Sequence, residues 1–142
     1  MVADWGRALS VAIRKSSSRL MIQLTKEDFS VDEAVRRMKN PGVGVVLTYV
    51  GMVREFPEGL GLEFESSSDA LERLEDIREI AISAFDVEDV AIIHRTGFLR
   101  LSDNILLVAV SASHRGAAFD ACQRIIDEIK TLHESWAKEV WR

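Results

Sequence analysis

The sequence predicts an α+β fold, in which a mostly antiparallel sheet has helices packed on a face. Apolar spacings indicate regular elements in the order β, α, β, β, α, β, β, β, α. Most of the strands follow one another through turns too short for a parallel crossover. The chain also lacks the glycine-rich phosphate loops and internal repeats of other fold classes. Its 142 residues suffice for one domain with a substantial core.

The first twenty residues differ in composition from the rest. They hold four basic residues against one acid, Asp4, and a run of three serines at 16–18. They lack the sustained apolar core of a secretory signal. We therefore interpret residues 1–20 as a basic, flexible extension and residues 21–142 as a single domain. This domain opens with a strand at residues 21–24.

The first helix is predicted from a capping box. Ser30 is followed three positions later by Glu33, and such a pair satisfies free N–H groups at a helix start. The helix ends near residue 39, because the Asn-Pro-Gly sequence at 40–42 breaks it. Valine-rich residues 43–53 then predict a buried strand, and residues 60–64 predict a shorter one.

The second half of the chain supplies two helices and three strands. Serines 66–68 are expected to cap a helix that ends near Phe85. Strands follow at residues 90–94, 98–101 and 105–112, and a Ser-Asp-Asn turn joins the last two. The last helix is predicted over residues 115–133.

This last helix has a buried stripe and a polar flank. The stripe follows steps of four, three and four residues and comprises Ala118, Cys122, Ile125 and Ile129. Cys122 is therefore expected to be a small core residue and not a nucleophile. The flank beside the stripe carries Lys130.

Composition excludes several classes of function. The chain has 18 Lys and Arg against 23 Asp and Glu, a formal net charge of −5, which argues against general nucleic-acid binding. One cysteine forms neither an internal disulfide nor a cysteine-based zinc cage, so a reducing cytoplasm is the simplest location. No apolar run reaches the length of a membrane span. No metal-ligand cluster is recognised, and no cofactor is predicted.

Cationic residues at the ends of regular elements indicate an anionic ligand. His114 and Arg115 begin the last helix, where free N–H groups and the helix dipole favour an anion. Arg54 ends a buried strand, and Lys130 lies farther along the same helix. Each also has a structural interpretation: a surface cap for the His-Arg pair, a surface charge for Arg54 and a snorkelling side chain for Lys130. The pair at 94–95 is interpreted as shaping a strand end.

Four segments together resemble one known family. They are GMVR at 51–54, IHRTG at 93–97 with Leu99, SHR at 113–115 followed by Ala118 and Phe119, and IKT at 129–131 followed by Trp136. In order and spacing they resemble the molybdopterin synthase large subunit, the MoaE family, over residues 21–136. The resemblance implies an α/β hammerhead fold and a homodimer of large subunits. It also implies a heterotetramer, in which each large subunit binds a ubiquitin-like carrier whose C-terminal Gly-Gly ends in a thiocarboxylate.

The resemblance also implies an activity and the residues for it. Sulfur passes from the carrier to cyclic pyranopterin monophosphate, which yields molybdopterin, and no metal or cysteine nucleophile is needed. The family's anion-binding positions fall on Arg54, His114 and Arg115, and its catalytic lysine falls on Lys130. The family commonly has Trp-Lys near the end of this segment, whereas here Ala137 follows Trp136 and the lysine is Lys138. We include Lys138 as a second catalytic candidate.

The chain also lacks other family features. The loop after Arg54 is short, the residues at 62–65 lack a common His-Tyr pair, and the chain stops at Arg142 without a longer tail. Three interpretations therefore remain open: the synthase subunit, a non-catalytic paralogue that binds a ubiquitin-like partner or an anion, and an unrelated α+β oligomerisation module. Arg115 and Lys130 stand fifteen residues apart on one helix, a rise of roughly 22 Å, so we expect a site shared across a two-fold dimer.

Overall fold

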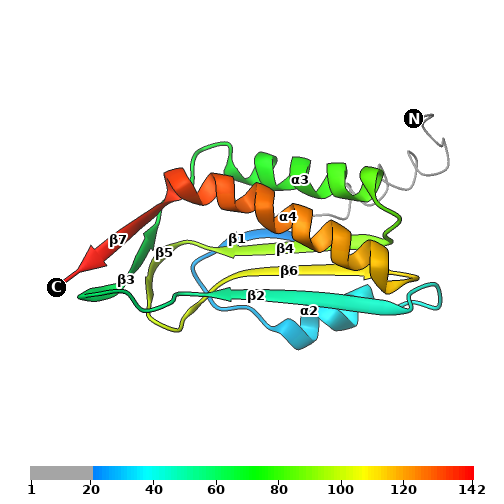
Figure 1. Ribbon diagram of the computed structural model, residues 1–142, viewed down its shortest axis with the longest axis horizontal. Helices are drawn as coiled ribbons and strands as arrows, with labels where there is room; N and C mark the ends of the chain where they lie inside the picture. The colour runs from blue at the N-terminus through cyan, green and yellow to red at the C-terminus, as the bar shows by residue number, and fades with distance from the viewer. Residues whose placement is uncertain (1–20) are drawn as a thin grey trace.

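The computed structural model describes residues 21–142, so the predicted extension at 1–20 lies outside the described residues. The described chain forms a four-stranded sheet, sheet A, and a three-stranded sheet, sheet B, at one end of it (Figure 1). The elements in chain order are β1 (Ile22–Thr25), α2 (Val31–Met38), β2 (Val45–Met52), β3 (Gly59–Phe64), α3 (Ala70–Ala84), β4 (Asp89–Arg95), β5 (Gly97–Arg100), β6 (Asn104–Ala112), α4 (Arg115–Trp136) and β7 (Ala137–Trp141).

The pairing of the strands confirms the predicted α+β class. Sheet A has the order β1-β4-β6-β2, in which β6 runs antiparallel to both of its neighbours and β1 runs parallel to β4. Sheet B has the order β5-β3-β7 with both pairs antiparallel. Gly97, at φ 88°, is the first residue of β5 and follows β4 after a single intervening residue. It therefore supplies the left-handed backbone with which the chain leaves sheet A for sheet B.

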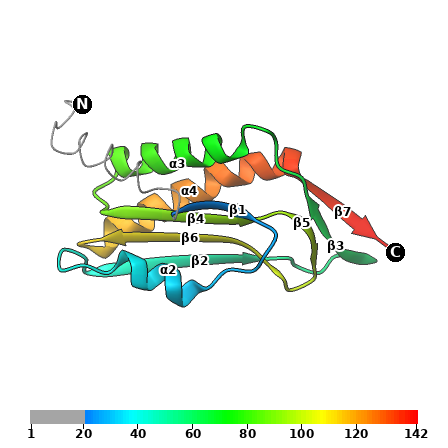
Figure 2. The ribbon, with the colours of Figure 1, turned by 180° about the vertical axis from the view of Figure 1, so that it is seen from behind.

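The helices cover both faces of sheet A (Figures 1 and 2). α3 and α4 share one face and α2 lies on the other. Alternation along β6 serves both layers, because Val108 belongs to the main core whereas Leu107 packs with Ala34 of α2. β6 is therefore apolar on both faces, as a central strand of a covered sheet must be.

The starts of two helices test the capping predictions. Ser30 Oγ accepts a hydrogen bond from the Glu33 amide at 3.2 Å, as the capping box predicts. The cap predicted at residues 66–68 is wrong by one residue, because Asp69 is the N-cap of α3. Ser67 Oγ instead donates to the Asp69 carboxylate at 2.6 Å. The serine hydroxyl thus binds the capping residue and not the helix N–H groups.

The predicted stripe of α4 is confirmed. All four of its residues are buried in the main core: Ala118, Cys122, Ile125 and Ile129. Burial raises the pKa of the Cys122 thiol to about 11, which agrees with a core role. α4 continues past the predicted end at residue 133 to Trp136, and an unpredicted strand, β7, follows at once and runs beside β3 (Figure 1).

Within residues 21–142, no helix combines the length and the apolar character that spanning a bilayer requires.

Candidate functional site

Two of the predicted cations line one hollow at the junction of the two sheets. Arg54 follows the end of β2, and Lys130 lies on α4 about two turns before the start of β7. The hollow has a volume of about 530 Å³ and is lined by Met52, Arg54, Glu55, Phe56, Leu62, Lys130 and Glu139. The fold therefore brings Arg54 and Lys130 together although 76 positions separate them in the sequence.

Lys130 also borders a second hollow, between β2 and the outer flank of α4. This hollow has a volume of about 410 Å³ and is lined by Leu47, Thr48, Tyr49, Phe119, Cys122, Gln123, Ile126, Asp127 and Lys130. β2 is an edge strand of sheet A, so the second hollow opens along the side of the molecule. Lys130 thus stands between a mixed polar hollow at one end of β2 and a more apolar one along it.

His114 and Arg115 lie at the opposite end of α4 from Lys130. His114 is the N-cap, makes no side-chain capping bond, and is exposed together with Arg115. The first turn of α4 contains no acidic residue, so the positive end of the helix dipole has no carboxylate there. Fifteen residues of helix separate Arg115 from Lys130, a rise of roughly 22 Å. A single chain does not bring these two cations to one small ligand.

The exposed cations are free to bind an external group. Within residues 21–142, the side chains of Arg54, Lys130, His114 and Arg115 make no hydrogen bond or ion pair with the rest of the protein. The arrangement suits an anion that arrives from outside, because Arg and His donors satisfy phosphate and carboxylate oxygens.

Lys138 does not join Arg54 and Lys130. It lies on β7, opposite Glu63 of β3, and its Nζ atom is 3.9 Å from Glu65 Oε2. Successive side chains on a strand point to opposite faces, and it is the next residue, Glu139, that lines the hollow. Sequence reasoning missed Glu139 because β7 was not predicted. Residues 137–141 carry no apolar–polar alternation that would have revealed it.

His94 and His133 form a further pair that the sequence did not reveal. Their Nε2 atoms are 2.7 Å apart, across β4 and α4. Arg95 acts as predicted at a strand end, since its guanidinium donates to the carbonyls of Asn104 at 3.1 Å and Lys26 at 3.0 Å. The contact between His94 and His133 joins positions 39 apart, which no local pattern predicts.

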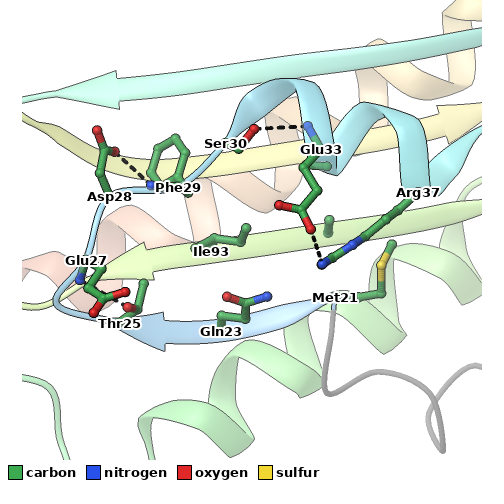
Figure 3. Close-up of a pocket in the computed structure, with 12 residues that line it drawn as sticks. Met21, Gln23, Thr25, Glu27, Asp28, Phe29, Ser30, Glu33, Arg37 and Ile93 are labelled. Atoms are coloured by element: carbon green, nitrogen blue, oxygen red, sulfur yellow. Dashed lines mark hydrogen bonds and ion pairs between the residues drawn. The ribbon is translucent and has the colours of Figure 1, made fainter.

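Two other hollows have features that disfavour them as the site. The one in Figure 3 lies between β1 and α2, and its polar groups are engaged with one another, as in the Glu33–Arg37 ion pair. The other is a small apolar groove of about 230 Å³ between α3 and α4. Neither contains a residue predicted for the site. Among the described residues, no group of three or more His, Cys, Asp or Glu side chains is placed to hold a metal ion.

Comparison with known proteins identifies the family. The sequence model of the family described as MoaE protein matches residues 24–132. The chain belongs to the MoaE family. It is 35% identical to a molybdopterin synthase catalytic subunit of Pyrococcus abyssi over 87% of this chain and 86% of that protein. It is 37% identical to the subunit of the same name from Vibrio cholerae over 84% of this chain and 83% of that protein.

A solved structure of a MoaE-family neighbour has the same fold. The crystal structure of molybdopterin synthase from Staphylococcus aureus aligns with a TM-score of 0.77 and 28% identity. The alignment covers 86% of this chain and 92% of the other. Membership in the MoaE family rules out the third interpretation of the sequence, an unrelated oligomerisation module.

Proposed function

We propose that this chain is the large, catalytic subunit of a molybdopterin synthase. It transfers sulfur from the thiocarboxylate of a small ubiquitin-like carrier to cyclic pyranopterin monophosphate. The observation that carries the proposal is the hollow in which Arg54 and Lys130 lie together, both without a side-chain hydrogen bond or ion pair. The relatives that this chain matches over most of their length are named as catalytic subunits, which agrees with a second, non-catalytic subunit in the enzyme.

The hollow suits the chemistry of acyl and sulfur transfer. Once the sulfur is bonded to the substrate, water adds to the carrier's terminal carbonyl carbon and gives a tetrahedral intermediate with negative charge on oxygen. Its collapse breaks the C–S bond, leaves the sulfur on the substrate and releases the carrier as a carboxylate. The Lys130 ammonium can orient the thiocarboxylate, stabilise that charge, or move a proton. Arg54 offers a planar, two-pronged donor for the phosphate of the substrate or the carboxylate of the spent carrier. Met52, Phe56 and Leu62 supply the apolar walls.

We further propose that the complete site is shared across a homodimer. Arg54 and Lys130 come from one subunit, and His114 and Arg115 of the second subunit complete the anion site. The separation of Arg115 from Lys130 along α4 supports this arrangement, since a small pterin phosphate does not span roughly 22 Å. A two-fold axis places the start of one helix beside the end of another without any new element.

The direct test is reconstitution. The protein is mixed with a thiocarboxylated carrier and the cyclic precursor, and the dithiolene product is measured. A carrier without its terminal Gly-Gly serves as the matched control, and it should bind far more weakly because the tail must thread toward Lys130. Equal binding of the two carriers, or no product from the intact one, would exclude sulfur transfer by this chain.

A non-catalytic paralogue is the second candidate, and one observation favours it. Ala137 stands where the family commonly has a lysine, and Lys138 pairs with Glu65 on the face of β7 away from the hollow. The paralogue would bind the carrier or an anion and release no product. The reconstitution assay separates the two functions, because only the enzyme form consumes the thiocarboxylate.

A further inference from the structure

A pair of histidines, one buried and one half-buried, joins the end of α4 to sheet A. His94 on β4 is fully buried, and its Nε2 atom lies 2.7 Å from Nε2 of His133. On the other side of the His94 ring, Nδ1 lies 2.6 Å from the carbonyl oxygen of Arg95. The chemistry proposed above uses neither imidazole, so the pair needs its own explanation.

The carbonyl decides which nitrogen of each ring carries the proton. A carbonyl oxygen only accepts, so His94 Nδ1 donates to it, and Nε2 of the neutral ring is an acceptor. His133 Nε2 must then donate to His94, which leaves His133 Nδ1 without a proton. The hydrogen bonds therefore run in one direction, from His133 through His94 to the Arg95 carbonyl. This assignment follows from the acceptor and is open to direct measurement.

Uncharged side chains enclose the pair. The Phe64 ring of β3 lies edge-on to both imidazoles, at centroid distances of 5.2 and 5.3 Å. Trp136 lies 5.4 Å from His94 on the α4 side. The neighbours of His94 within sheet A are Leu24 of β1 and Leu106 of β6. The fully buried His94 therefore makes its hydrogen bonds shielded from water, whereas His133 is half-buried.

The charged group that acts on the pair is Lys130. Burial, and next the charge of His133, lowers the pKa of His94 to about 4. Burial, and next the charge of Lys130, lowers the pKa of His133 to about 4. The guanidinium of Arg95 is engaged with the backbone carbonyls of Lys26 and Asn104. Both rings are therefore neutral near pH 7, and Lys130 is close enough to His133 for its charge to matter.

Lys130 lies in the turn just before His133, on the exposed flank of α4, whereas Ile129 and Leu132 pack the helix into the main core. The two hollows of about 410 and 530 Å³ both border Lys130, so few neighbouring side chains restrict the Lys130 side chain itself. Apolar contacts are non-directional, whereas a hydrogen bond fixes direction as well as distance. A 20° rotation of α4 would move a side-chain end about 6 Å from the helix axis by roughly 2 Å.

We propose that His133, held by His94, is a positioning residue for Lys130. The hydrogen bond between the two rings sets the rotation of the last turns of α4, and with it the place in the hollow to which the Lys130 ammonium points. The inference rests on the proposed function, because it assigns the pair a task in sulfur transfer. A displacement of about 1 Å at a reacting group is enough to reduce turnover up to roughly a hundredfold.

Two substitutions separate the hydrogen bond from the space the ring fills. His133→Phe keeps an aromatic ring beside Phe64 but has no donor for His94, whereas His133→Gln keeps an N–H donor at a similar reach. We expect His133→Phe to lower kcat by roughly tenfold to a hundredfold per folded molecule, with KM for the carrier little changed. His133→Gln should restore most of the rate. Glu134→Gln, at the exposed neighbouring residue, is the control and should match wild type.

Nuclear magnetic resonance of the imidazole nitrogens tests the pair without turnover. We expect the proton on Nδ1 of His94 and on Nε2 of His133. Lys130→Gln should raise the pH midpoint of His133, because it removes a nearby positive charge. A wild-type protein that makes no product would refute the proposed function. The positioning role is overturned separately, either by wild-type kcat in His133→Phe or by a His133 midpoint that ignores Lys130→Gln.

Discussion

Subunit exchange tests whether the site needs two chains. Arg115→Ala and Lys130→Ala homodimers should each be inactive, since every site in them lacks one cation. In an equal mixture after exchange, about half of the dimers carry one subunit of each kind. Each such dimer has one intact site and one doubly damaged site, so roughly a quarter of all sites recover. The dithiolene assay should then report roughly a quarter of the wild-type activity.

A second pair of variants gives the matched control. Arg54 and Lys130 line one hollow of a single chain, so mixed dimers of Arg54→Ala and Lys130→Ala contain no intact site. That mixture should stay inactive under the same conditions. Exchange itself is verified by mass spectrometry of differently tagged subunits. If exchange is complete and the Arg115→Ala mixture shows no recovery, then the whole site lies within one subunit and the shared arrangement is wrong.

Four further outcomes are expected. Lys130→Ala should abolish turnover and leave the thermal midpoint nearly unchanged, because an exposed side chain without partners contributes little to stability, and full activity would contradict its role. Lys138→Ala should keep wild-type rates if its place on β7 excludes it from the chemistry, and a large loss of rate would show that it reaches the substrate. The free energy of unfolding should decrease as the pH is lowered from about 6.5 to about 4. In this range His94 and His133 bind protons in the unfolded chain, whereas their lowered pKa values keep the pair neutral in the folded protein. Replacing His133 by Gln should remove part of that slope in urea unfolding at several pH values. Cys122 should react with a thiol reagent only on unfolding, and rapid labelling of the folded protein would contradict its core position.

Local patterns predicted most of the elements, because their causes are local. The capping box at Ser30 and the apolar stripe of α4 each depend on residues within a few turns, and both were placed correctly. β7 was missed because it has only five residues, directly continues α4, and gains its strand character by pairing with β3. Predicting it requires knowing which edge is free, and this information is not local.

The site itself could be predicted only in part. Arg54, His114 and Arg115 were recognisable at the ends of elements, where binding residues are common, and Lys130 lies within α4. The sequence did not show which of these cations lie close together, because Arg54 and Lys130 are brought to one hollow by the docking of α4 on sheet A. The link between His94 and His133 depends on the same docking. Non-local contacts therefore decide the chemistry, whereas local patterns decide the scaffold.

The change from helix to strand at Ala137 determines which lysine side chains line the hollow. Ala137 and Glu139 share one face of β7, and Glu139 lines the hollow, so a lysine at position 137 would point to the same side. In this chain that position carries no charge, and Lys138 pairs with Glu65 on the opposite face. Among the described residues, Lys130 is therefore the one lysine that lines the hollow. Because no second lysine ammonium lines the hollow, a contact that orients the Lys130 ammonium has a larger effect on the site. The hydrogen bond from His133 to His94, which we propose is such a contact, lies one turn away from Lys130.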